Sequence, residues 1–275
     1  MNRSVNLKRY LLSWRDKAAH GGEMGTRIED IVDEGTRVVA LAEERGVPLR
    51  LVGGVAVRLR CPDAAQRPEL ARTYKDIDFA APRRTAKAVR ELLAAQGYAP
   101  NSHFNALHGA SRLLFYDEEH GRQVDVFLGT FEMCHKLNLE PRFSLPGPAL
   151  PPADLLLLKL QIVQLNEKDV IDALTLLLQY EPVPKDGPDT LSSDYIARLC
   201  AGDWGWYTTL HDNLETVRVR APEIIGPPED TATAQARIDT LLATLEAAPK
   251  SVGWRLRDRI GRRKAWYELP EEVER

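Results

Sequence analysis

The chain has 275 residues, enough for one large domain or for a core domain with a helical appendage. A hydrophobic fraction of 44% and a charged fraction of 28% are typical of a globular protein and exclude the disordered and fibrous classes. The 37 Lys and Arg residues against 40 Asp and Glu residues give a net charge of −3, which excludes a protein that coats nucleic acid by charge alone. Three widely spaced cysteines, Cys61, Cys134 and Cys200, form no CxxC pair, which argues against a disulfide framework and a structural zinc site.

The start of the chain and its most apolar run are the two places where a targeting or membrane signal would be expected. Residues 1–22 begin with charges and lack the apolar core and small-residue cleavage site of a signal peptide. The most apolar run, residues 155–165, is interrupted by Lys159 and is too short to span a bilayer. We therefore expect a soluble, cytoplasmic protein that does not contact the membrane.

The first half of the chain alternates between helical and extended patterns. Gly46 ends the first helical pattern, and Gly53-Gly54 follows the first strand pattern. The turn residues 117–121 between two apolar runs predict a β-hairpin. In chain order we expect a helix over 26–45, a strand over 47–52, a short helix over 55–60, a loop over 62–71, a strand over 73–80, a helix over 84–96, and hairpin strands over 111–116 and 123–128.

Beyond the Pro-rich residues 146–152 the sequence becomes helical. Helices are predicted over 154–165 and 168–179, and several more follow up to residue 263. This order is typical of an α+β fold, in which a small mixed β-sheet has flanking helices and a C-terminal helical subdomain. We expect three parts: an N-terminal helical segment (1–46), a core that carries the sheet (47–145) and a helical subdomain (146–275).

Three carboxylates lie on predicted strands. Asp76 and Asp78 are two residues apart, so they project from the same face of their strand and repel each other unless a cation lies between them. A hard divalent ion such as Mg²⁺ relieves that repulsion and can also hold phosphates. Asp125 lies on a separate strand, and if the two strands are neighbours the three carboxylates suit two-metal phosphoryl transfer. The alternatives are a solvated edge strand for the Asp pair and a simple strand end for Gly53-Gly54.

Taken together, Gly53-Gly54, Asp76, Asp78 and Asp125 resemble the nucleotidyltransferase superfamily that includes DNA polymerase beta and the aminoglycoside nucleotidyltransferases. The resemblance implies that the two glycines let the backbone approach the phosphates of a nucleotide. It also implies that the paired carboxylates hold two Mg²⁺ ions and that the third carboxylate helps to activate the attacking hydroxyl. The interval from the glycines to the Asp pair is longer than in the shortest forms of the superfamily, and the predicted loop over 62–71 accommodates it.

The segment RTYKDIDF, residues 72–79, looks like the AbiEii-type nucleotidyltransferases, many of which are the toxin half of toxin–antitoxin pairs. That group carries Arg, any residue, Thr, any residue and then Asp-x-Asp. Arg72 is in place, whereas Thr73 stands one position early. The similarity continues to Lys159 and to Asp169, and it implies that Lys159 reaches the nucleotide phosphates. Lys159 also fits a lysine that extends along an amphipathic helix, and Asp169 fits a favourable charge at a helix N-terminus.

We therefore expect a Mg²⁺-dependent nucleotidyltransferase that moves NMP from an NTP to an acceptor hydroxyl. The acceptor is a tRNA, as in toxin–antitoxin systems, or a small hydroxylated molecule, and an antitoxin protein is a further expected partner. The expected nucleotide-binding residues are Gly53, Gly54, Arg58, Arg72 and Lys159. The alternative from another class is a non-catalytic scaffold of the same fold that binds a nucleotide or a protein.

The C-terminal part carries a run of basic residues with tryptophans on either side. Such a run suits contact with an RNA acceptor, or equally a solvated helix face whose charges pair with acidic neighbours. The aromatic residues over 203–207 are expected to pack in the core rather than to stack on a ligand. Cys134 and His135 are expected to have a packing role rather than to bind a metal. The basic residues are Arg255, Arg257, Arg259, Arg262, Arg263 and Lys264.

Overall fold

The computed structural model describes residues 27–269, and the described chain divides into two compact units. Unit 1 comprises residues 27–56, 74–129 and 139–149. Unit 2 comprises residues 57–73, 130–138 and 150–269. The prediction that residues 1–22 carry no signal peptide lies outside the described residues.

Unit 1 is built on a five-stranded mixed sheet with the strand order β1-β2-β5-β4-β3. The pair β2–β5 is parallel and the other neighbouring strands are antiparallel. The predicted α+β fold with a small mixed sheet is therefore confirmed. The strands are β1 (Arg50–Val52), β2 (Asp76–Ala81), β3 (Ala99–Pro100), β4 (Arg112–Asp117) and β5 (Arg122–Leu128).

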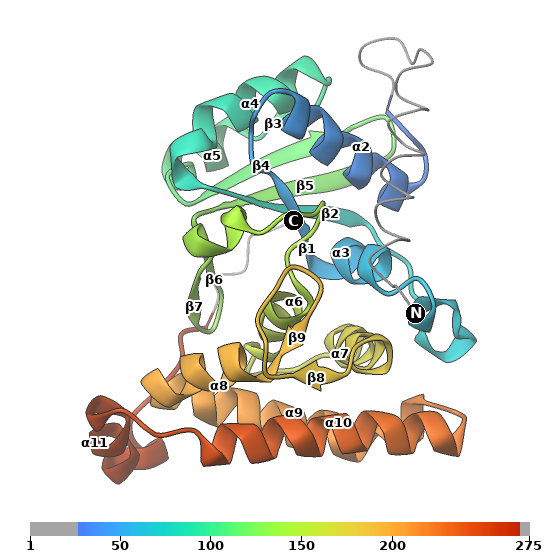
Figure 1. Cartoon of the computed structure of the whole chain (residues 1–275). Coiled ribbons are helices and arrows are strands. Elements are labelled where there is room, and N and C mark those ends of the chain that lie inside the picture. Colours follow the sequence, from blue (N-terminus) through green and yellow to red (C-terminus); the bar gives the residue numbers. More distant parts are fainter. Residues whose placement is uncertain (1–26, 270–275) are drawn as a thin grey trace. The chain divides into compact units, whose positions relative to one another are not determined.

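The sheet of unit 1 has one apolar face, which two helices cover (Figure 1). Ile77, Val124 and Leu113 project from this face and are fully buried. On the covering helix α2, a Cβ atom added at Gly35 would lie 2.9 Å from Leu51 Cδ2, so the helix backbone lies directly on the sheet. The helices that begin in unit 1 are α2 (Ile31–Glu44), α3 (Gly53–Arg60), α4 (Ala86–Ala95) and α5 (Ser102–His108), of which α2 and α4 cover the apolar face.

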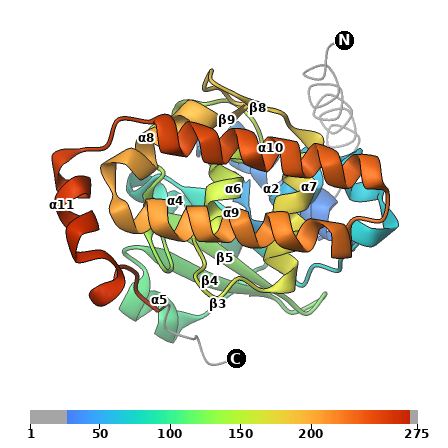
Figure 2. The same cartoon turned by 90° about the horizontal axis from the view of Figure 1, so that it is seen from below.

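Unit 2 is mostly helical, with a Leu-rich core to which α6 contributes Leu155, Leu156 and Leu157. The two longest helices, α9 and α10, run side by side (Figure 2). Two small strand pairs, β6–β7 and β8–β9, complete it. Its elements are β6 (Thr130–Glu132), β7 (Lys136–Asn138), α6 (Pro152–Leu160), α7 (Glu167–Gln179), β8 (Pro182–Val183), β9 (Leu191–Ser192), α8 (Ser193–Gly202), α9 (Trp204–Ile224), α10 (Pro228–Ala247) and α11 (Val252–Ile260).

The helices and strands differ from the predictions where contacts between residues distant in sequence determine where an element ends. The helix predicted over 154–165 ends at Leu160, because the Asn213 side chain on α9 donates hydrogen bonds to the carbonyls of Leu160 and Ile162, each at 2.8 Å. These bonds satisfy backbone acceptors that a longer helix would have used internally. The predicted loop over 62–71 contains two short 3₁₀ turns, Ala64–Gln66 and Pro68–Leu70.

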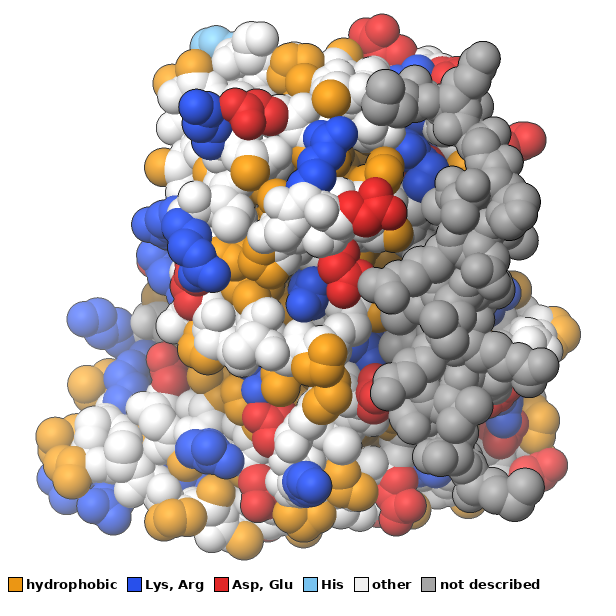
Figure 3. Space-filling model, turned by 45° about the horizontal axis from the view of Figure 1, so that its top comes forward, with side chains coloured by type: hydrophobic (Ala, Val, Ile, Leu, Met, Phe, Trp, Pro, Cys, Tyr) orange, Lys and Arg blue, Asp and Glu red, His pale blue; other side chains and the backbone are white. Residues whose placement is uncertain are grey.

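The surface of the molecule carries mixed charge. On the face shown in Figure 3, basic and acidic side chains lie among hydrophobic ones, and neither sign forms a broad field. This agrees with the near balance of charges in the sequence. Within residues 27–269, every helix is too short or too polar to cross a bilayer.

Candidate functional site

The three predicted carboxylates lie on one face of the unit 1 sheet, opposite the face that α2 covers. Asp78 on β2 is directly opposite Asp125 on β5 in the parallel pair, and Asp76 is opposite Gln123 in the same register. Residues two apart on a strand share a face, so all four side chains project to the same side. Asp76 is exposed, Asp78 is half-buried and Asp125 is buried.

Gly53 lies against the carboxylate of Asp78. The last residue of β1, Val52, is opposite Asp78 in the antiparallel pair, and Gly53 follows it as the first residue of α3. Its φ is +67°, and a Cβ atom added there would lie 2.1 Å from Asp78 Oδ2. Both the left-handed backbone and the closeness of the Asp78 carboxylate therefore require glycine at this position. Gly54, in the first turn of α3, is buried.

Asp125 is held by two donors that the sequence analysis missed. Arg112 Nε on β4 donates to Asp125 Oδ1 at 2.7 Å, and Gln123 Nε2 donates to Asp125 Oδ2 at 2.7 Å. The hairpin contained a signal for Arg112: once the turn fixes the register, Arg112 is opposite Phe127, on the same face as Asp125. Gln123 also lies two residues before Asp125 and so shares that face.

Asp76 and Asp78 have the right chemistry for one hard cation, since two carboxylates on one face of a strand offer the oxygen ligands that Mg²⁺ prefers. Across the described part of the chain, however, no three His, Cys, Asp or Glu side chains come together in a group that could hold a metal ion. In this arrangement Asp125 is bonded to Arg112 and Gln123. The metal role of the three carboxylates stays a prediction.

Two of the predicted phosphate-binding cations, Arg72 and Lys159, lie together in unit 2. Arg72 donates to Asp172 Oδ2 at 2.6 Å, and Lys159 Nζ lies 2.8 Å from the same oxygen and 3.2 Å from Asp169 Oδ1. Burial alone would lower the pKa of Lys159, but Asp172 and Asp169 raise it above its ordinary value, so the ammonium stays charged. The third predicted cation, Arg58, is half-buried on α3.

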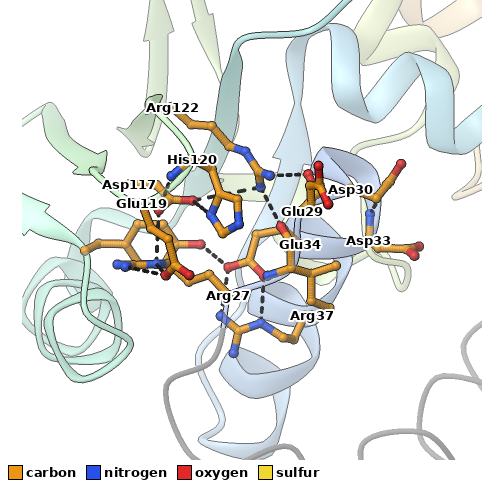
Figure 4. Close-up of polar contacts among 12 residues, drawn as sticks. Arg27, Glu29, Asp30, Asp33, Glu34, Arg37, Asp117, Glu119, His120 and Arg122 are labelled. Carbon is orange, nitrogen blue, oxygen red and sulfur yellow. Dashed lines mark hydrogen bonds and ion pairs between the residues drawn. The ribbon is translucent and has the colours of Figure 1, made fainter.

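A second polar cluster in unit 1 lies on the apolar face of the sheet, around the fully buried Asp117 at the end of β4 (Figure 4). Arg27 Nε and His120 Nδ1 each lie 3.0 Å from this carboxylate. Arg122 donates to the backbone carbonyls of Ile28 and Glu29. These contacts attach residues 27–29 to the β4–β5 hairpin, so the cluster has a structural role.

The basic C-terminal run packs against aromatic rings within unit 2. The Arg257 guanidinium lies 4.7 Å from the ring centre of Trp204, and that of Arg262 lies 5.2 Å from the ring centre of Trp266. Arg262 also pairs with Asp212 at 2.8 Å. Both arginines therefore have partners in their own unit.

Comparison with known proteins gives limited likeness. No protein-family model matches the chain, and no curated protein matches it. A lincomycin-bound crystal structure of the lincosamide antibiotic adenylyltransferase LnuA is similar over 51% of this chain and 92% of its own, with 19% identity and a TM-score of 0.38. A solution structure of the antibiotic-resistance factor ANT(2'')-Ia is similar over 76% of this chain and 91% of its own, with 13% identity and a TM-score of 0.34. Likeness at this level does not establish a shared activity, so the functional conclusion depends on the residues of the sheet.

Proposed function

We propose that the protein is a divalent-metal-dependent nucleotidyltransferase that moves NMP from an NTP to an acceptor hydroxyl. The observation that carries this proposal is the meeting of three features in unit 1. Asp78 is opposite Asp125 on the neighbouring parallel strand, and its carboxylate lies against Gly53 at the start of α3. A carboxylate pair beside a helix N-terminus can receive both a metal ion and the phosphates that accompany it.

The glycines and the start of α3 would bind the triphosphate. The first N–H groups of a helix have no intrahelical acceptor, and the helix dipole favours an anion near them. Without a side chain, the half-buried Gly53 leaves its backbone open to close approach by phosphate oxygens, and the buried Gly54 would contribute through its place in the first turn of α3. The triphosphate would therefore lie beside Asp78.

Asp76 and Asp78 would hold the divalent ion, which when bound supplies positive charge to the phosphoryl group. In the transfer, the acceptor oxygen forms a bond to the α-phosphorus while the bond to pyrophosphate breaks. Asp125 lies one strand away from Asp78 and would orient the acceptor hydroxyl and receive its proton by exchanging its bond to Arg112 or Gln123 for one to the hydroxyl. The sequence resemblance implies two such ions.

The other predicted nucleotide-binding residues keep their role as predictions. Arg72 and Lys159 have their charges balanced by Asp169 and Asp172 in unit 2, so they would bind phosphate only by exchanging these carboxylates for it. Arg58 would meet phosphate from α3, the helix that Gly53 begins.

The acceptor is proposed as a class, a hydroxyl on a tRNA or on a small molecule. A toxin-like enzyme with an antitoxin partner would use the first, and an antibiotic-modifying enzyme would use the second. Incubation with radiolabelled NTP and either bulk tRNA or lincomycin, the molecule bound in one of the compared structures, separates the two by the product that carries the label.

Thermal unfolding tests the nucleotide site directly. The wild-type protein is heated with ATP, GTP, CTP or UTP in the presence and absence of Mg²⁺, beside the double variant Asp76→Asn/Asp78→Asn. A ligand at about one hundred times its dissociation constant stabilises the folded state by about 2.7 kcal/mol. We expect a Mg²⁺-dependent shift in the wild type that the double variant loses and that Asp194→Asn, an exposed control, retains.

The absence of a shift with every NTP, together with no labelled product, would contradict the proposal and favour the non-catalytic scaffold.

A further inference from the structure

Helix α11 carries an exposed apolar stripe at one end of unit 2 (Figure 2). Val252, Leu256 and Ile260 are four residues apart, so they lie along one side of the helix over about 12 Å. They are 64%, 55% and 46% exposed, and they make up three of the seven exposed large hydrophobic residues of the described chain. Single exposed hydrophobic residues are ordinary, but a continuous row on one short helix indicates an interaction surface.

The opposite side of α11 fixes the helix to the rest of unit 2. The ring of Trp254 lies 5.2 Å from that of Tyr207 on α9. Asp258 accepts a hydrogen bond from Trp204 Nε1 at 2.7 Å, and the Arg257 guanidinium lies 4.7 Å from the centre of the Trp204 rings. The helix is therefore packed on its inner side, and the apolar stripe belongs to its outer side.

Two arginines lie along one flank of the apolar stripe. At about 100° per residue, Arg255 and Arg259 follow the same side of α11, next to Val252 and Leu256. Both arginines are exposed, and within residues 27–269 neither side chain has a hydrogen bond, an ion pair or a ring contact. The one acidic residue of α11, Asp258, is on the inner side. The outer face of α11 therefore combines an apolar row with a positive row that has no carboxylate of its own.

This combination argues against a second copy of the chain and against RNA as the occupant. A second copy of the same face would add two more arginines and no carboxylate, so like charges would meet. RNA that lacks base pairing is bound by cations together with aromatic rings on which bases stack. The stripe is aliphatic, and the one aromatic residue of α11, Trp254, packs inward against Tyr207.

The placement of the charges also argues against an anionic bilayer. A helix that lies in a membrane surface presents bulky aromatic residues beside its aliphatic ones, with cations on both flanks at the same depth. On α11 the exposed arginines line one flank only. The other flank carries Gly253 and Arg257, and the guanidinium of Arg257 is turned inward onto Trp204. A partner with its negative charge along one side of an apolar row fits this asymmetry better than a flat surface does.

We propose that the outer face of α11 binds an acidic amphipathic helix of a protein partner. Aliphatic residues three and four apart on that helix would pack on the stripe formed by Val252, Leu256 and Ile260. Asp or Glu residues beside them would pair with Arg255 and Arg259 and give the partner its orientation. The surface is made by unit 2 alone and goes beyond the proposed function, so neither depends on the other.

The test uses the full chain and two synthetic peptides of about 20 residues, long enough to form a helix. The acidic peptide has leucines three and four residues apart with glutamates along one side of them, and the basic peptide has lysine in place of each glutamate. Fluorescence anisotropy of a label on the peptide measures binding. We expect the acidic peptide to bind at least about tenfold more tightly than the basic one.

Variants on the outer face of α11 separate the apolar contribution from the charged one. Leu256→Glu should weaken binding of the acidic peptide at least about tenfold. Arg255→Glu/Arg259→Glu should do the same and should bind the basic peptide more tightly than the acidic one, because the charges are exchanged. Val219→Glu on α9 and Arg198→Glu on α8 change exposed residues of the same two kinds elsewhere in unit 2, and both should bind as the wild type does.

The inference is overturned if the acidic peptide does not bind, if both peptides bind equally, or if Leu256→Glu binds as the wild type does. It is also overturned if another occupant takes the face. Sedimentation of a wild-type dimer that Leu256→Glu dissociates would assign the face to a second copy of the chain. Binding of phosphatidylserine vesicles or of single-stranded RNA, lost in Arg255→Glu/Arg259→Glu, would assign it to a membrane or to a nucleic acid.

Discussion

Replacing Gly53 by alanine is expected to cause a large loss of NMP transfer and only a modest loss of folding stability. Two separate effects are involved. The backbone at Gly53 has a φ of +67°, a conformation that costs an alanine about 1–2 kcal/mol. The new Cβ atom would also lie 2.1 Å from Asp78 Oδ2, which only a displacement can relieve.

The size of that displacement sets the expected loss of function. A Cβ contact shorter than 3.0 Å is essentially never seen, so Asp78 Oδ2 must move by about 1 Å. Metal–ligand distances tolerate only about ±0.2 Å, and a misplacement of about 1 Å can lower a reaction rate about 100-fold. We therefore expect about a 100-fold loss of NMP transfer and a clear loss of Mg²⁺-dependent nucleotide binding.

Gly46→Ala is the matched control. Gly46 has a φ of +69°, but a Cβ atom added there would meet nothing within 4 Å. Urea unfolding should show similar backbone costs for the two variants, while only Gly53→Ala loses nucleotide-dependent stabilisation and transfer. If Gly53→Ala transfers NMP as well as Gly46→Ala does, Asp78 does not act from the position described here.

Three further predictions concern stability, and urea unfolding measures each. Lys159→Met should lower the free energy of unfolding by about 3 kcal/mol, because it leaves the buried Asp172 without one of its cations, and a loss below about 1 kcal/mol would contradict this pairing. Burial lowers the pKa of His135, so the unfolded chain takes up a proton that the folded one does not, and wild-type stability should fall as the pH drops below about 6.5. His135→Gln should flatten that dependence, and an unchanged pH profile would show that His135 does not cause it. Asp117→Asn should cost about 3 kcal/mol by leaving Arg122 and its neighbours without their buried carboxylate, and a cost no greater than that of a surface substitution would refute the structural role of the cluster.

Local signals made part of the site predictable from sequence. Gly53-Gly54 follows an apolar strand, and the turn over 117–121 separates two apolar runs, so the start of α3 and the β4–β5 hairpin both lie close to where they were predicted. The same-face placement of Asp76 and Asp78 needs only the two-residue period of a strand.

The partners of Asp125 and Lys159 could not be predicted in the same way. The parallel pairing that puts Asp78 opposite Asp125 joins strands separated by two α-helices and two further strands, and no local pattern specifies such a pairing. Lys159 looked like a phosphate ligand because it interrupts an apolar run. Its bond to Asp172 depends on how α6 and α7 pack, which periodicity does not contain.

The short sequence separation between Arg112 and Asp125 has a consequence for how this sheet assembles. The two residues are 13 positions apart and belong to one hairpin, so their ion pair can form as soon as the hairpin closes. The pairing of β2 with β5 must close a much longer loop and is expected to be slower. Asp125 is then already neutralised when Asp78 reaches it, and the like charges of the two strands do not oppose their docking. Pulse-labelling hydrogen exchange should find the amides of β4 and β5 protected before those of β2.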